Sequence, residues 1–136
     1  MAHHILFEIV TPLNILVTTV YWSILRERAL ATFATTKILA LHSGIIHLMP
    51  MVCNLICFSV TDVSIKASHG LGLLPLCILY GYSNYQVTKA QGYPVYHFLT
   101  WEDETSFLIF GCITMAGLLS YMLLAVLTKL IKRPQK

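Results

Sequence analysis

Charged residues are scarce in this chain. Asp, Glu, Lys and Arg together make up 11% of its 136 residues, whereas hydrophobic residues make up 57%. A water-soluble domain keeps many charged side chains on its surface, so this composition leaves little of the chain for such a domain. It predicts an integral membrane protein instead.

Other absences narrow the function further. The sequence has no basic stripe interleaved with aromatic residues, so we expect no nucleic-acid partner. Residues 1–8 have neither a Lys/Arg-rich start nor a small-residue cleavage site, so they indicate neither a secretory signal nor a transit peptide. The four cysteines all lie in apolar stretches, and we interpret them as small packing residues that do not report the redox compartment.

Four apolar stretches occupy most of the chain. A helix needs about 20 mostly apolar residues to cross a bilayer. We therefore predict a single all-α domain over residues 1–136, a polytopic transmembrane helix bundle with about four spans. The third stretch is the weakest, because Pro75 and Gly81 interrupt it and its end is rich in tyrosine. The four expected spans are roughly residues 7–25, 38–60, 71–87 and 106–130.

The second stretch is the most polar of the four. Polar side chains inside a bilayer are costly, so they mark either function or bonding between helices. We interpret His47 and Asn54, seven residues apart on one helix face, as packing residues that bond to a neighbouring helix. Asn14 in the first stretch receives the same interpretation. The polar and helix-bending residues of the second stretch are His42, Ser43, His47, Pro50 and Asn54.

Ser43 and His47 also permit a hydrolase hypothesis. Four residues apart on a helix, they share a face, so the imidazole could activate the hydroxyl if an orienting group and oxyanion donors were present. His42 is a further catalytic candidate. A haem site has less support, because His42 and His47 diverge by about 140° around one helix. A second helix would have to supply His69 or His97, and we expect neither a cofactor nor a metal ion.

Glu8 is expected at the membrane interface. A proton-relay role would require it to lie deeper, with a partner such as His47. Tyr21 and Trp22, near the far end of the same stretch, are typical of the aromatic belt at headgroup level.

The chain ends with basic residues that suit a lipid surface. Lys129 at the end of the last apolar stretch, and Lys132 and Arg133 just beyond it, are expected to contact anionic headgroups. Trp101, before that stretch, is expected at headgroup level as well. Thr100 is the expected N-cap of the last helix.

One family resemblance rests on three segments. Pro12 begins an apolar run that ends at Tyr21 and Trp22, residues 42–50 join two histidines to a proline, and residues 92–99 form a glycine-led aromatic turn. Together they resemble the last four spans of the androgen-induced membrane hydrolase family. Members of that family have six spans and hydrolyse fatty-acid esters of hydroxy fatty acids.

The resemblance implies a catalytic histidine but leaves the nucleophile without a counterpart. The family histidine corresponds to His42 or His47, and the spacing to Pro50 does not decide between them. The family nucleophile is a threonine in an earlier span, which this sequence does not contain. His97 stands where the family has a proline.

These observations lead to two hypotheses. The first is a non-catalytic accessory subunit of a larger membrane complex, with other transmembrane subunits and phospholipids as partners. We expect this complex to be a respiratory or other energy-converting complex of the mitochondrial inner membrane. The alternative is a membrane-embedded fatty-acyl ester hydrolase that uses His47, Ser43 or His42.

Overall fold

The fold is helical throughout the part of the chain that the structure describes. The computed structural model describes residues 2–132, is 82% helical and contains no strand in that range. The predicted all-α class is therefore confirmed. The elements in chain order are α1 (Ala2–Val20), a π-helical turn η1 (Tyr21–Leu25), α2 (Arg26–Thr32), α3 (Lys37–Val60), a 3₁₀ helix η2 (Ala67–Gly72), α4 (Leu73–Gln91) and α5 (Glu104–Ile131).

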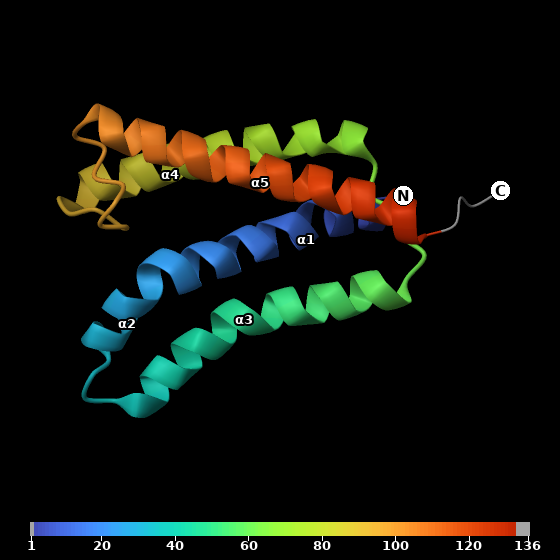
Figure 1. The fold of residues 1–136 in the computed structure, drawn as a ribbon. Coiled ribbons are helices and arrows are strands. Elements are labelled where there is room, and N and C mark those ends of the chain that lie inside the picture. Colours follow the sequence, from blue (N-terminus) through green and yellow to red (C-terminus); the bar gives the residue numbers. More distant parts are fainter. Residues whose placement is uncertain (1, 133–136) are drawn as a thin grey trace.

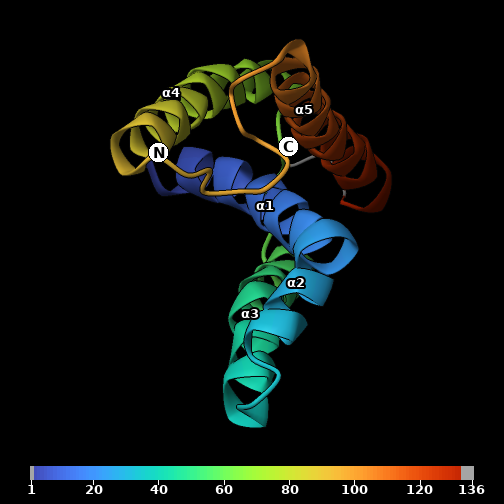
Figure 2. The ribbon, with the colours of Figure 1, turned by 90° about the vertical axis from the view of Figure 1, so that its left-hand side faces the viewer.

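Helix α1 is the centre of the arrangement. It packs against α5 on one side and against α3 on the other, and α4 packs against α5 (Figure 1). Seen from the end, α3 extends away from the α1, α4 and α5 group, with α1 at the junction (Figure 2). The bundle is therefore open on both sides of α3.

Three helical segments are long and apolar enough to cross a membrane. They are His4–Thr32, Lys37–Val60 and Glu104–Ile131. The expectation of four spans is thus met for three, while α4 does not qualify. The reason lies in the second half of α4, where tyrosines alternate with Ser83, Asn84, Gln86 and Lys89. The first span is also longer than predicted, because the helix continues through the charged residues 26–28.

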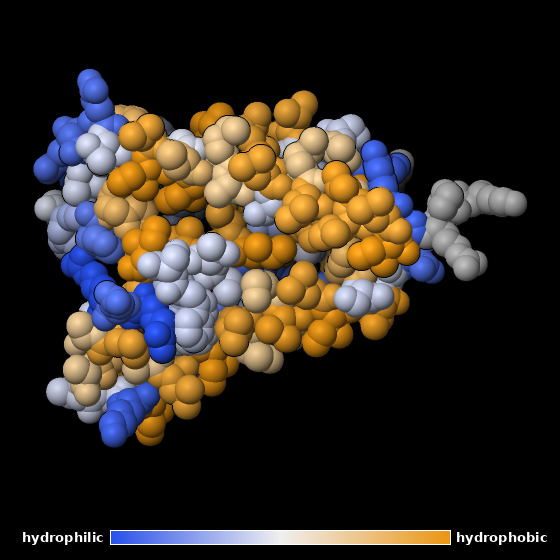
Figure 3. Space-filling view, viewed as in Figure 1, coloured by the Kyte–Doolittle hydropathy of each residue, from blue (hydrophilic) through white to orange (hydrophobic). Residues whose placement is uncertain are grey.

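The buried core is small and lies where α1 begins and α5 ends. Its buried members are Phe58, Ile65, Leu73, Tyr121, Leu124 and Ala125. Outside this core, many large apolar side chains are exposed along the helices, and hydrophilic residues gather at the two ends of the face in view (Figure 3). Helix α3 buries Phe58 alone. Such a surface is suited to hydrocarbon, which solvates apolar side chains as well as a protein core does.

Lys132 joins the end of α5 to the end of α3. The last carbonyl groups of a helix have no partners within it, and a lysine can supply donors there. The Nζ–Phe58 ring distance is 4.1 Å. Burial lowers the pKa of Lys132, and the charge of Asp62 opposes that effect. The ammonium group donates to the carbonyl oxygens of Phe58 (2.7 Å), Thr61 (2.6 Å) and Val63 (2.7 Å).

Replacing Lys132 with methionine is expected to destabilise the bundle by about 1–2 kcal/mol. Hydrogen bonds to a charged donor are worth about 1.5–3 kcal/mol when desolvated, and Lys132 is only half-buried. The free energy of unfolding in mixed micelles measures the loss. Lys129→Met is the matched control, because Lys129 lies exposed in the last turn of α5. An equal loss in both variants would contradict a specific role for Lys132.

Candidate functional site

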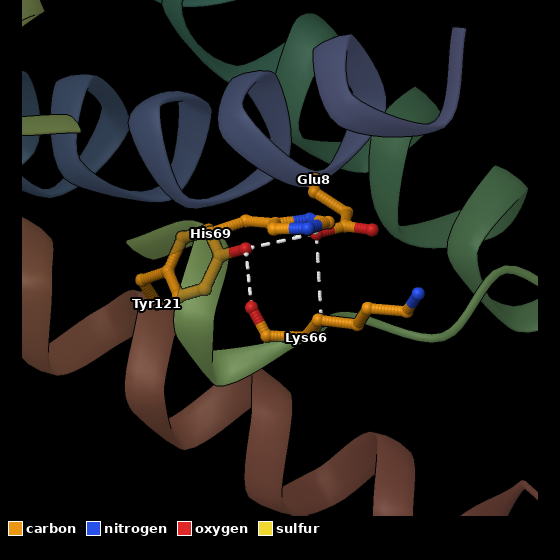
Figure 4. A network of polar contacts seen from close by, with 4 residues as sticks. All are labelled: Glu8, Lys66, His69 and Tyr121. Carbon is orange, nitrogen blue, oxygen red and sulfur yellow. Dashed lines mark hydrogen bonds and ion pairs between the residues drawn. The ribbon is translucent and has the colours of Figure 1, made fainter. Parts of the chain in front are cut away.

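A buried carboxylate on α1 contacts three other parts of the fold. Glu8, on α1, is 2% exposed. Its Oε2 lies 2.8 Å from His69 Nδ1, a hydrogen-bond distance, and accepts hydrogen bonds from the Tyr121 hydroxyl at 3.0 Å and from the Lys66 backbone N–H at 3.4 Å (Figure 4). Residues from α1, η2, α5 and the segment before η2 thus meet at one oxygen atom.

The chain reaches this carboxylate because α3 is followed by an extended segment, residues 61–66, rather than by another helix. The 3₁₀ helix η2 then turns His69 toward α1. Gly70 lies against the ring of Tyr121, where a Cβ atom would be 2.9 Å from Tyr121 Cδ1. The absence of a side chain at residue 70 therefore lets η2 and α5 approach closely.

The protein encloses Glu8, which we expected at the membrane interface. Its side chain is 2% exposed and bonds to partners from other parts of the fold. Its partner is His69 and not His47. The contact of Glu8 Oε2 with His69 Nδ1 is an ion pair when His69 is protonated.

A second polar cluster fastens α3 to α1. The Tyr21 hydroxyl donates to Ser43 Oγ at 2.9 Å, and its ring stacks on the His47 imidazole with centroids 3.9 Å apart. Thr18 Oγ1 donates to the carbonyl oxygen of His47 at 2.6 Å. Tyr21 is 4% exposed, so its ring lies between helices.

The same cluster bears on the hydrolase hypothesis. His47 Nδ1 lies 2.7 Å from the carbonyl oxygen of Ser43. A carbonyl oxygen only accepts, so Nδ1 of His47 carries a proton and donates to it. The Ser43 hydroxyl is bonded to Tyr21, and within residues 2–132 no hydrogen bond joins it to the imidazole of His47. The expected pair shares a helix face but does not form a nucleophile–base contact.

The other polar packing candidates lie in different surroundings. Asn54 Nδ2 donates to the carbonyl oxygen of Pro50 at 2.9 Å, within α3 and not across to a neighbouring helix. Asn14 is half-buried on α1. His42 is exposed on α3. Pro12 lies inside α1, and not in a first turn, because that helix begins at Ala2.

Trp101 is buried within the protein, which leaves its indole little surface for contact with a lipid headgroup. It is 8% exposed, and its Nε1 donates to Asn84 Oδ1 at 2.7 Å. Its backbone φ of +59° turns the chain inward before α5. Asp103, and not Thr100, is the N-cap of α5, since its side chain accepts from the backbone N–H of Ser106.

The basic residues at the end of α5 have separate roles. Lys129 is exposed and available to a lipid headgroup. Lys132 was expected to contact headgroups too, but its ammonium group is occupied by three backbone carbonyl groups. Arg133 lies outside the described residues. The histidines and cysteines form no metal-binding group of three or more within residues 2–132, counting acidic residues as well.

Comparison with known proteins gives no match, since no family model, no curated protein and no solved structure is similar to this chain. The resemblance to the androgen-induced hydrolase family therefore stays an expectation. The three apolar helices indicate an integral membrane protein.

Proposed function

We propose that this chain is a non-catalytic accessory subunit of a larger membrane complex. The observation that carries this proposal is the position of α3. This helix of 24 residues packs mainly on α1, buries Phe58 alone and leaves most of its residues exposed. It therefore presents most of its circumference to other molecules in the membrane.

Polar groups on α3 favour a protein neighbour over lipid alone. The amide of Asn54 bonds only within its own helix, to Pro50. Pro50 has no N–H, so it leaves the carbonyl of Ile46 without its usual helical partner. Unpaired polar groups in hydrocarbon are costly, and a helix of another subunit can supply their partners.

The polar side chains inside the bundle support the same proposal. Between α1 and α3, Tyr21 donates a hydrogen bond to Ser43 and stacks on His47. These polar side chains therefore hold the two helices together. The hydrolase alternative needs a free Ser43 hydroxyl facing an imidazole nitrogen. Other transmembrane subunits and phospholipids are the partners that we propose, in an energy-converting organellar membrane such as the mitochondrial inner membrane.

Native gel electrophoresis of gently solubilised membranes tests this function. We expect the tagged chain to migrate in an assembly several times its own mass. The substitution Ile45→Trp on the exposed face of α3 is expected to lower the assembled fraction at least severalfold. Leu119→Trp on the exposed face of α5 is the matched control and should leave that fraction unchanged. Migration of the wild-type chain as a small free species would overturn the proposal.

A further inference from the structure

Beyond its packing role, the chain holds an imidazole and a phenol that both contact one buried carboxylate. We propose that Glu8, His69 and Tyr121 form a proton-binding site that takes up and releases one proton at the membrane surface next to Lys66. The ligand is the proton itself, shared between the carboxylate and the imidazole.

The contact between Glu8 and His69 can hold a proton on either atom. Oε2 and Nδ1 are 2.8 Å apart, a normal distance for a hydrogen bond in both directions. Protonated Glu8 donates from Oε2 to an unprotonated Nδ1, whereas ionised Glu8 accepts from a protonated Nδ1. The two states need no movement of the heavy atoms.

Tyr121 fits both states because its hydroxyl has two acceptors at the same distance. Its oxygen lies 3.0 Å from Glu8 Oε2 and 3.0 Å from the Lys66 carbonyl oxygen. A phenol has one proton to donate. It can donate to an ionised Glu8, and it can rotate toward Lys66 when Glu8 is protonated and itself becomes a donor. The Lys66 carbonyl also accepts from the His69 backbone N–H, so it is bonded in either case.

The charge of the pair depends on this single proton. When the proton is bound, the pair of Glu8 and His69 has no net charge, either as two neutral groups or as an ion pair. When the proton has left, the pair carries one negative charge. No other ion pair involves Glu8 within residues 2–132, and the Lys66 side chain points away from it (Figure 4). The titratable or charged groups on the elements nearest the pair are His4 on α1, Asp62 and Lys66 before η2, Cys57 near the end of α3, Cys77 on α4, and Lys129 and Lys132 at the end of α5.

His69 gives the proton a route to water. Its side chain is 34% exposed, against 3% for that of Glu8. It lies three residues after Lys66, at the end of the bundle that also carries Asp62, Lys129 and Lys132. For release, the proton moves from Glu8 Oε2 to His69 Nδ1, and the imidazolium then loses a proton from Nε2 to water. Uptake reverses the two steps, and no other reactant is needed.

Two site-resolved titrations in lipid nanodiscs test the proposal. Nitrogen-15 NMR follows the imidazole of His69, and isotope-edited infrared spectroscopy follows the carboxyl band of Glu8. We expect both signals to change at one common midpoint pH, because interacting groups titrate as a pair. A carboxyl band that stays constant while His69 titrates would identify a fixed structural contact and overturn the proposal. This comparison uses wild-type protein and does not depend on whether a variant folds.

Variants give an independent check. Glu8→Gln removes the negative partner, so the His69 midpoint should move to lower pH by about one unit, a tenfold loss of proton affinity. Glu27→Gln removes an exposed glutamate from α2 and should leave the midpoint unchanged. Tyr121→Phe should retain the common transition but shift its midpoint. An unchanged His69 midpoint in folded Glu8→Gln protein would contradict the shared proton.

Discussion

Replacing Tyr21 with alanine is expected to detach α3 from α1, with a loss of about 3 kcal/mol in the free energy of unfolding. Removal of a buried aromatic side chain costs about 3–5 kcal/mol in protein cores, and lipid that enters the gap offsets part of this. Tyr21 is 4% exposed and supplies both the stacking contact with His47 and the hydrogen bond to Ser43. At this end of α3 the one further hydrogen bond described above is that of Thr18 to the His47 carbonyl, while Phe58 and Lys132 hold the other end.

Spin labels on α1 and α3 measure the detachment as a broader distribution of distances, and unfolding in mixed micelles measures the energy. Tyr82→Ala is the matched control, since Tyr82 is 60% exposed on α4. It should change the stability by less than about 0.5 kcal/mol. Tyr21→Phe isolates the hydroxyl group and should cost about 1 kcal/mol. Equal effects of the two alanine substitutions would show that α3 is held by other contacts.

The bounds of two spans could be predicted because hydropathy changes sharply at their ends. Residues 38–60 and 106–130 correspond to α3 (Lys37–Val60) and α5 (Glu104–Ile131). Composition alone decides where an apolar run can enter hydrocarbon. The segment 71–87 was harder to judge, since its helix forms as expected while its polar second half keeps it from qualifying as a span.

The site around Glu8 could not be predicted, because its partners lie far away along the chain. His69 and Tyr121 are 61 and 113 residues from Glu8, and helical periodicity relates only residues within a few turns. One sequence signal was available: a single acidic residue inside an apolar run is costly unless it has partners. That signal indicates a buried network but does not identify its members.

The contacts of Trp101 and Lys132 could not be predicted from their neighbours in the sequence. Each lies next to charged residues at the end of a span, the usual place for a headgroup contact. The backbone at Trp101 adopts a φ of +59° and turns the indole toward Asn84. Lys132 meets the end of α3 at Phe58, which lies 74 residues earlier in the chain. Both outcomes depend on tertiary contacts that no short window of sequence contains.

Alanine at position 70 is expected to destabilise the protein by about 2–3 kcal/mol, the upper part of the range for overpacking. The new Cβ atom would be 2.9 Å from Cδ1 and 3.2 Å from Cε1 of Tyr121. The ring cannot retreat, because Tyr121 is fully buried and its hydroxyl is bonded to Glu8 and Lys66. Either η2 moves away from α5, or the phenol leaves the carboxylate.

Gly72→Ala separates this steric effect from the general effect of replacing a glycine. Gly72 lies in the same 3₁₀ helix, and its Cβ atom would make an ordinary contact of 3.8 Å with Ile9 Cδ1. Neither glycine has a positive φ, so both backbones accept alanine, and Gly72→Ala should be neutral or stabilising by about 0.4–1 kcal/mol. Thermal unfolding compares the two. Similar melting temperatures would mean that Tyr121 yields freely, and its hydrogen bonds to Glu8 and Lys66 could then not fix the geometry of the proton site.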